Sequence, residues 1–394
     1  MNQRELFLRH VAQTSPAPLA LEIVKAEGAE LFDVNGQSYI DLIGGISVAN
    51  VGHRHPAVIA AIHQQLDAYL HVMVYGEFIQ SPQVQYAQHL IGQLPSTLNS
   101  VYFTNSGAEA VEGAMKLAKR VTGRTGIIAF KNSYHGSTQG ALSIIGDEYW
   151  RNAYRPLLPG ILHEEYGSPQ AIVAVSEQIA CVIVEPLQAE AGVKSPPPGW
   201  LGALRERCSE TGTLLIIDAI QTGFGRTGTM WGFEQSGIVP DVLLLGKALG
   251  GGMPLGAFIT DVEKMNQLAS MPVLGHITTF GGHPVCCAAG LAAMKALEDE
   301  ALMAGIDAKA SLFRTLLVSP AIKEIHANGL WLAVEFGSFE INKHIIDRCI
   351  AHGVLTDWFL FAPNCLRISP PLVIDEAQIR KACAVILDAI ASLP

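Results

Sequence analysis

Three ionisable residues stand at the ends of short apolar runs. Glu185 follows the run CVIV, Asp218 follows LLII, and Lys247 comes directly after VLLLG. If these runs are parallel strands of one sheet, their carboxyl ends meet at the crevice where α/β proteins bind ligands. Burying any one of the three groups alone is costly. Two interpretations follow: an internal ion pair that holds loops together, or a reactive site.

Lys247 lies in the glycine-rich sequence GKALGGGMPLG. A lysine in a dry site can lose its proton and attack a carbonyl carbon to form a Schiff base. The glycines allow a ring and its bound substrate to approach the backbone closely. A phosphate-binding P-loop is excluded because it requires glycine at position 241 and serine or threonine at position 248, where this chain has Asp241 and Ala248.

A second candidate site opens an expected helix. The sequence NSGAEA follows the apolar run VYF and precedes a segment with apolar residues on one face, for which Gly123 marks the expected end. Free backbone N–H groups at Ser106, Gly107 and Ala108 would form a phosphate site at the helix N-terminus. An ordinary helix cap is the alternative.

The sequence GFGRTG at 223–228 matches the dinucleotide-binding pattern GxGxxG only in its letters. It does not directly follow the apolar run that ends before Asp218, and the glycine-broken segment after it does not predict a helix. A dinucleotide site requires both flanking elements, so the pattern disfavours a nicotinamide-dependent dehydrogenase.

A sheet must position these residues. Apolar runs without polar alternation recur at 101–103, 127–130, 181–184, 214–217, 242–245 and 255–259. Such runs are typical of strands buried on both faces of a largely parallel sheet, and the amphipathic stretches between several of them predict covering helices. Upstream, Asn35-Gly36 predicts a hairpin turn and Pro56 a helix start. Beyond about 285–300, an alanine-rich helix gives way to an α+β pattern.

Composition narrows the class of protein. At 394 residues the chain is long enough for two or three domains. It has 26 basic and 36 acidic residues, a formal charge of −10 and no basic run, which disfavours nucleic acid or a membrane surface as a partner. We expect no signal peptide and no membrane span. The seven cysteines include no CxxC pair, so we expect no metal, buried reduced thiols and a cytoplasmic location.

Several motifs together resemble the class III aminotransferases, with the acetylornithine/ornithine subgroup nearest. They are NSGAEA, YHG, VEPLQAE, DAIQTGFGRTG, GKALGGG and TTFGGHP. The resemblance implies the fold-type I α/β architecture, with a mostly parallel central sheet covered by helices and a smaller α+β C-terminal domain. It implies an N-terminal segment at 1–50, a large cofactor domain at 51–292 and a small domain at 293–394. It also implies a homodimer with shared active sites.

The resemblance further implies pyridoxal 5'-phosphate as cofactor. Lys247 would carry it and shuttle the proton, and Asp218 would keep its pyridine nitrogen protonated. The other expected cofactor-binding residues are Ser106, Gly107, Ala108, Tyr134, His135, Glu185, Ile220, Gln221, Thr278 and, from the neighbouring subunit, Thr279.

Glu190 and Arg367 resemble the family's switch pair. The glutamate would cover the arginine when the substrate presents a distal amine, and release it to hold the α-carboxylate of the keto-acid partner. A plain salt bridge is the alternative. Ile46 stands where ornithine-specific enzymes carry tyrosine, which favours acetylornithine or 4-aminobutyrate over free ornithine.

Ser137 departs from the family motif His-Gly-Arg, whose arginine holds a second substrate carboxylate in the acetylornithine/ornithine subgroup. Serine cannot form a bidentate charge-assisted pair, and losing one from a partly buried site costs roughly 2–5 kcal/mol. Either another arginine substitutes, with Arg151 and Arg155 nearest in sequence, or the substrate lacks that carboxylate.

These features favour a transaminase. It would move an ω-amino group from a donor such as acetylornithine, ornithine or 4-aminobutyrate to a keto acid such as 2-oxoglutarate. An aminomutase or decarboxylase on the same scaffold is the first alternative. A cofactor-binding protein without turnover is the second, and is disfavoured because the proton-shuttling Lys247 is present.

Overall fold

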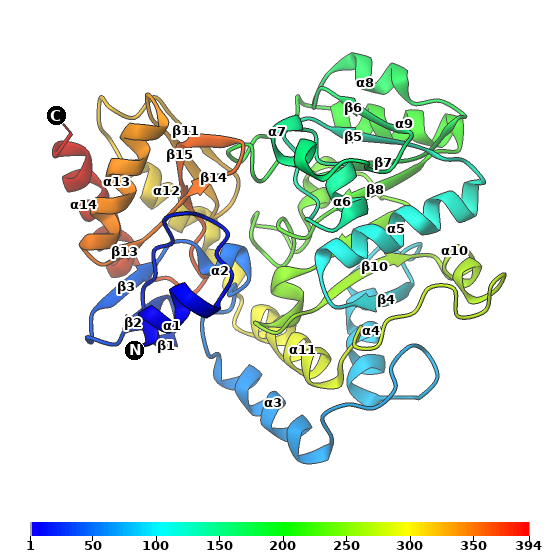
Figure 1. Ribbon diagram of the computed structural model, residues 1–394, viewed down its shortest axis with the longest axis horizontal. Helices are drawn as coiled ribbons and strands as arrows, with labels where there is room; N and C mark the ends of the chain where they lie inside the picture. The colour runs from blue at the N-terminus through cyan, green and yellow to red at the C-terminus, as the bar shows by residue number, and fades with distance from the viewer. Residues whose placement is uncertain (1, 394) are drawn as a thin grey trace.

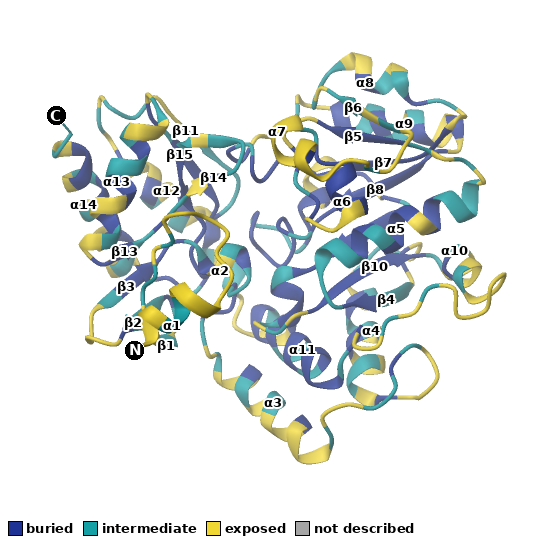
Figure 2. Cartoon of the chain, viewed as in Figure 1, coloured by how far each residue is buried: buried dark blue, intermediate teal, exposed yellow. Residues whose placement is uncertain are grey.

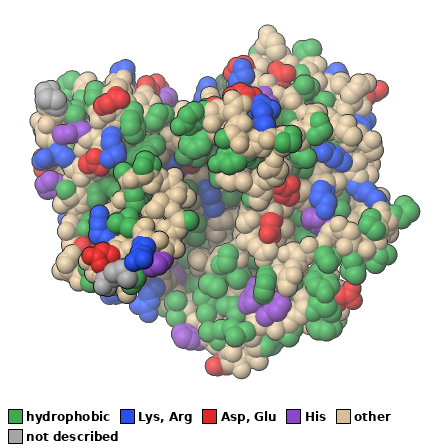
Figure 3. Space-filling model, in the orientation of Figure 1, with side chains coloured by type: hydrophobic (Ala, Val, Ile, Leu, Met, Phe, Trp, Pro, Cys, Tyr) green, Lys and Arg blue, Asp and Glu red, His purple; other side chains and the backbone are tan. Residues whose placement is uncertain are grey.

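The computed structural model describes residues 2–393, which form two lobes with a crevice between them (Figure 1; Figure 3). The larger lobe is built on a seven-stranded sheet in the order β4-β10-β9-β8-β7-β5-β6. Its strands are β4 (Ser100–Thr104), β5 (Gly126–Phe130), β6 (Ile161–Glu164), β7 (Ile179–Val184), β8 (Leu214–Asp218), β9 (Val242–Leu245) and β10 (Gly256–Thr260).

The apolar runs become the strands that the sequence predicts. Every residue of β7, β8, β9 and β10 is buried, and these strands form the dark interior of the larger lobe in Figure 2. Within the described residues, β10 is the one antiparallel strand of this sheet, pairing with β9 on one side and β4 on the other. The prediction of a largely parallel sheet is therefore confirmed, with β10 as its exception.

Helices cover both faces of the sheet. The helices of this lobe are α3 (Pro56–Ala68), α4 (Ser81–Gly92), α5 (Gly107–Thr122), α6 (Gln139–Ser143), α7 (Glu148–Arg151), α8 (Pro169–Ala174), α9 (Trp200–Thr211), α10 (Val262–Met265) and α11 (Pro284–Asp299). Alternate residues of β8 serve the two faces: Ile216 shares a core with Val111 of α5, whereas Leu215 and Ile217 share the other core with Leu204 of α9.

Helix α5 begins and ends where its sequence predicts. The Ser106 hydroxyl accepts a hydrogen bond from the Glu109 backbone N–H at 3.2 Å, and Gly123 closes the helix at φ +68°, a left-handed conformation that glycine adopts without strain. Glu109 lies in the first turn and Arg120 in the last, so both charges complement the helix dipole. The GxGxxG segment at 223–228 opens no α-helix.

The smaller lobe joins both ends of the described chain. One sheet, β1-β2-β3-β13, pairs strands from the first 41 residues with β13 from the C-terminal part, and a second has the order β11-β12-β15-β14. Its elements are α1 (Gln3–His10), β1 (Ile23–Glu27), β2 (Glu30–Asp33), β3 (Ser38–Asp41), α2 (Gly44–Ser47), α12 (Ile306–Leu316), β11 (Glu324–Ala327), β12 (Leu332–Glu335), α13 (Phe339–Ala351), β13 (Val354–Leu355), β14 (Trp358–Phe359), β15 (Ala362–Ile368) and α14 (Glu376–Ala391).

Two further expectations concern this lobe. The hairpin predicted at Asn35-Gly36 forms between β2 and β3, with Gly36 at φ +82°, which confirms the turn. The pairing of β3 with β13 is compatible with an N-terminal segment that joins the small domain. The boundaries at residues 50 and 292 remain predictions.

Arg226 links the two lobes. Its buried guanidinium donates to Leu330 O at 2.9 Å, to Pro370 O at 2.7 Å and to Asn50 Oδ1 at 2.6 Å. A buried guanidinium without hydrogen-bond partners is energetically costly. These contacts therefore hold the loop after β8 against segments from the N-terminal and C-terminal parts of the chain.

All seven cysteines are free and buried. Across residues 2–393, no helix is both long and apolar enough to cross a membrane.

Candidate active site

The carboxyl ends of β7, β8 and β9 bring Glu185, Asp218 and Lys247 into one cavity of about 220 Å³. The three strands are adjacent and parallel, so the residues that follow them converge, as the sequence predicts. The cavity is lined by Gly107, Ala108, Tyr134, His135, Gly136, Ser137, Glu185, Ala189, Glu190, Asp218, Ile220, Gln221, Thr222 and Lys247.

Lys247 begins a short 3-10 turn with φ +49°, a left-handed conformation that costs free energy for a residue with a Cβ. Its Nζ donates to Gln221 Oε1 at 2.6 Å. Burial lowers the pKa of Lys247 from 10.5 to about 8, and the Glu190 carboxylate partly opposes that shift. A substantial fraction of the amine is therefore neutral near pH 8 and able to act as a nucleophile.

Asp218 is fixed by two donors. His135 Nδ1 lies 2.7 Å from its Oδ2, and the Ile220 backbone N–H donates to its Oδ1 at 3.0 Å. Burial acts to lower the pKa of His135, but the hydrogen bond and charge of Asp218 outweigh it, so the pKa is raised. His135 thus supports the carboxylate form of Asp218 at the cavity wall.

Glu185 organises the loop beneath the cavity. Its carboxylate accepts hydrogen bonds from the Tyr134 N–H at 3.1 Å and the Ala189 N–H at 2.8 Å. Burial raises the pKa of Glu185 to about 7, against the opposing charge of His135. Because Ala189 precedes Glu190, Glu185 also positions the next carboxylate of the site.

The first turn of α5 faces the cavity. Gly107 and Ala108 line it, and the first N–H groups of a helix have no acceptor within the helix. A Cβ on Gly107 would lie 2.7 Å from Ile220 Cδ1, so a larger residue here would force the Ile220 side chain to shift. The backbone N–H groups of this turn can bind an anion.

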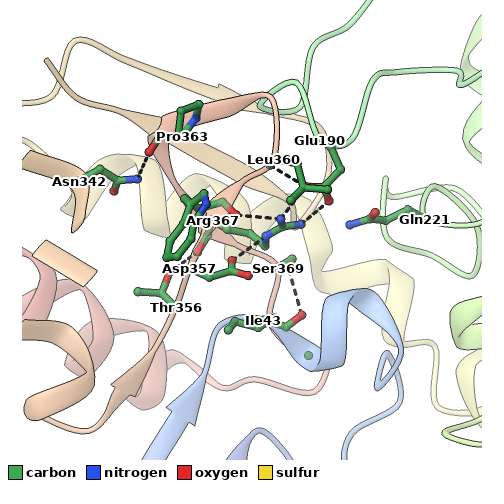
Figure 4. A network of polar contacts seen from close by, with 12 residues as sticks. Ile43, Glu190, Gln221, Asn342, Thr356, Asp357, Leu360, Pro363, Arg367 and Ser369 are labelled. Carbon is green, nitrogen blue, oxygen red and sulfur yellow. Dashed lines mark hydrogen bonds and ion pairs between the residues drawn. The ribbon is translucent and has the colours of Figure 1, made fainter. Parts of the chain in front are cut away.

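Glu190 and Arg367 meet across the two lobes (Figure 4). Arg367 donates from both terminal nitrogens to Glu190, each at 2.9 Å, and from Nε to Asp357 at 2.7 Å. The Leu360 N–H also donates to Glu190 at 3.0 Å. Burial raises the pKa of Glu190, but Arg367 outweighs burial and the pKa is lowered. The pair is closed and fully charged.

Besides Arg367, which lies behind Glu190, four predicted site residues do not line the cavity. Thr278 Oγ1 accepts from Asn105 Nδ2 at 2.9 Å outside it, and Thr279 is exposed. Ile46 lies in a short turn at φ +63°, and the Ser106 hydroxyl is occupied as the cap of α5. The structure thus brings together the expected residues at the strand ends and α5 but not these four.

Sequence reasoning missed Asp357, which holds the Nε edge of Arg367. It follows β13 and precedes β14 in no recognisable motif, so only the pairing of β14 with β15 brings it to Arg367. Sequence reasoning also did not find that His135 contacts Asp218, because 83 residues separate them.

The cavity brings together backbone N–H groups that can bind an anion, a lysine of lowered pKa and a buried carboxylate. It is large enough for a small ring. Two polar atoms that line it, His135 Nε2 and Gln221 Nε2, are buried without a hydrogen-bond partner. These groups suit a phosphorylated aromatic aldehyde. The sequence pattern described as Aminotransferase class-III matches residues 11–390. The chain belongs to the class III aminotransferases.

Individual relatives agree with this assignment. An acetylornithine aminotransferase of Methanopyrus kandleri is 40% identical over 394 residues, covering 99% of each chain. Among solved structures, an ornithine aminotransferase of Toxoplasma gondii superposes with a TM-score of 0.91 at 31% identity, covering 98% of this chain and 93% of that one. A pyridoxal-phosphate-bound amine transaminase of an uncultivated Pseudomonas species has a TM-score of 0.88 at 28% identity, covering 97% and 98%.

This class III aminotransferase therefore has the fold-type I architecture, uses pyridoxal phosphate and transfers amino groups. The prediction of a transaminase is confirmed. The cavity fits the cofactor, since it offers backbone donors at α5 for the phosphate, Lys247 for the aldehyde and Asp218 for the pyridine nitrogen.

Proposed function

We propose that Lys247 carries the cofactor and transfers the proton during amino-group exchange between an amine or ω-amino acid and a 2-oxo acid. The observation that carries this proposal is the lowered pKa of Lys247 beside Gln221, in a cavity that also holds Asp218. When bound, pyridoxal phosphate supplies the electron sink that stabilises negative charge on the substrate carbon.

The chain's own residues prepare that chemistry. Asp218, supported by His135, would hold a proton on the pyridine nitrogen. Gln221 holds Lys247 Nζ at 2.6 Å and would bind the phenolic oxygen. Ile220 and Tyr134 would contact the ring, and the N–H groups of α5 would hold the phosphate.

Glu190 and Arg367 provide one interchangeable carboxylate site. Glu190 occupies both terminal nitrogens of Arg367 while Asp357 keeps the Nε edge. A substrate carboxylate can therefore replace Glu190 in the same bidentate geometry without leaving the guanidinium unpaired. An amine that lacks a carboxylate reacts with the pair closed.

A homodimer would complete the site. Exposed apolar side chains gather in two segments of the larger lobe that touch each other through the rings of His71 and Phe280, 4.8 Å apart. They are Leu70, Phe78, Ile79, Met271, Val273, Leu274, Ile277 and Phe280. Such a surface is typical of a subunit interface, and Thr279 within it would reach the cofactor phosphate of a second copy.

The buried free cysteines support a cytoplasmic location.

The visible spectrum of the purified protein tests the proposal. Adding one amine or ω-amino acid at a time, including acetylornithine and 4-aminobutyrate, should remove the absorption of the aldehyde form of the cofactor. Adding a 2-oxo acid should restore it. An amine that is consumed with release of carbon dioxide, or that is isomerised without a 2-oxo acid, would contradict transamination as the main reaction.

A further inference from the structure

The cavity wall at Ser137 carries no charge. Ser137 Oγ lies 3.0 Å from the Tyr134 hydroxyl, and both residues line the cavity. Each group satisfies the other with a neutral hydrogen bond. Ser137 is exposed, and a carboxylate placed beside it would meet no arginine among the described residues that line the cavity.

Neither of the arginines nearest in sequence to Ser137 replaces the arginine of the family motif. Arg151 is buried and directs its guanidinium to Glu148, to His163 at 2.9 Å and to Ser143 O at 3.5 Å. Arg155 donates to Glu148 at 2.7 Å and to Asn152 at 3.1 Å. Neither lines the cavity, so the substitution considered from the sequence does not occur in the structure.

The remaining charges around the cavity are mostly negative. Its lining has three carboxylates, on Glu185, Glu190 and Asp218, against the single ammonium group of Lys247 and the Asp218-bound ring of His135. Lys247 is reserved for the cofactor. Arg367, behind Glu190, is therefore the one arginine that contacts the lining among the described residues and can be released to a substrate.

Two apolar segments would face a second copy of the chain. These segments, 66–84 and 271–283, contain no lysine or arginine. They do contain His71, His276 and His283, and burial lowers the pKa of His276 and His283. Lys116 and Arg120 of α5 contact the second segment at His276 and Met271.

Two aromatic side chains outside the cavity lining lie near the backbone of Glu190. Trp150 of α7 meets Phe361 edge to face with ring centroids 6.2 Å apart, and the Phe361 N–H donates to Glu190 O at 2.9 Å. Trp150 and Phe361 therefore connect the two lobes next to the Glu190–Arg367 pair.

We propose that the site holds one substrate carboxylate at a time, so that the acceptor is a 2-oxo monocarboxylic acid and the donor presents a neutral or apolar group toward Ser137. This inference rests on the proposed function and specifies its substrate class. The transfer needs only water in addition: the keto carbon gains the amino group, a proton and two electrons, its oxygen leaves as water, and a water molecule returns the cofactor to its aldehyde form.

The test isolates the acceptor. Apoprotein is loaded with pyridoxamine phosphate, pyruvate or 2-oxoglutarate is added, and the return of the aldehyde absorption is timed. We expect pyruvate to react at least about tenfold faster, because 2-oxoglutarate must place its second carboxylate without a cation. Ser137→Arg should raise the rate with 2-oxoglutarate about tenfold or more, whereas Ser137→Ala should leave the preference unchanged.

The outcomes separate the two proposals. If the unmodified protein reacts with 2-oxoglutarate as fast as with pyruvate or faster, the one-carboxylate inference is wrong while transamination stands. If neither acid regenerates the aldehyde form and no amine consumes it, the proposed function itself is wrong. The rate ratio of the unmodified protein decides the matter even if Ser137→Arg does not fold.

Discussion

At the scale of single residues, the lysine that carries the chemistry is tuned by its surroundings. Burial lowers the pKa of Lys247 to about 8 from 10.5. Since only the neutral amine attacks the cofactor aldehyde, the rate at which apoprotein captures pyridoxal phosphate should rise with pH and reach half its maximum near pH 8. A stopped-flow pH profile measures this. A midpoint near pH 10 would mean that the ammonium group is not desolvated as the structure indicates.

Glu190→Gln tests the exchange of carboxylates on Arg367. The glutamine keeps the shape of the side chain, but only its amide oxygen can accept from Arg367. Loss of one hydrogen bond and of the negative charge weakens the pair by roughly 1–1.5 kcal/mol. Asp357 still balances the arginine. We therefore expect KM for a carboxylate-bearing acceptor to fall about tenfold, with little change for an amine lacking a carboxylate. Glu210→Gln, at an exposed pair with Arg207, is the control. An unchanged or higher acceptor KM would contradict the exchange.

At the scale of elements, the approach of α5 to the loop after β8 shapes the cofactor cradle. Gly107→Ala puts a methyl group 2.7 Å from Ile220 Cδ1, and overpacking of this kind costs typically about 1–3 kcal/mol. Because Ile220 would move into the ring space, the Kd for pyridoxal phosphate should rise about tenfold or more. Fluorescence titration of apoprotein measures it. Gly202→Ala on α9, where a Cβ meets nothing within 4 Å, should bind normally; equal affinity in both variants would remove the steric argument.

The elements also show how far sequence reasoning reaches. Strands β7, β8 and β9 were predictable because burial on both faces leaves continuous apolar runs, and the site residues at their ends followed from that. Edge strand β6 was not predicted, since it is only half-buried and carries His163 and Glu164. The antiparallel direction of β10 was also not predicted, because an apolar run does not indicate the direction of its strand. The roles of Asp357 and His135 depend on tertiary contacts between segments far apart in sequence.

At the scale of the whole molecule, exposed apolar side chains gather in the segments 70–79 and 271–280. Ile79 is 95% exposed, and a charge there would oppose burial in an interface. We expect Ile79→Asp to shift the protein from dimer to monomer in sedimentation velocity and to weaken cofactor binding. Val173→Asp on α8, an exposed apolar site away from both segments, should remain dimeric. A monomeric parent protein with full activity would show that the site needs no second copy.

The central claim is that Lys247 holds pyridoxal phosphate, and one measurement tests it directly. The holoenzyme is treated with borohydride, which fixes the bond between cofactor and lysine, and the digested protein is mapped by mass spectrometry. We expect the cofactor mass on the peptide containing Lys247 and on no other. Cofactor on a different lysine, or no attached cofactor in a protein that still transaminates, would contradict the account.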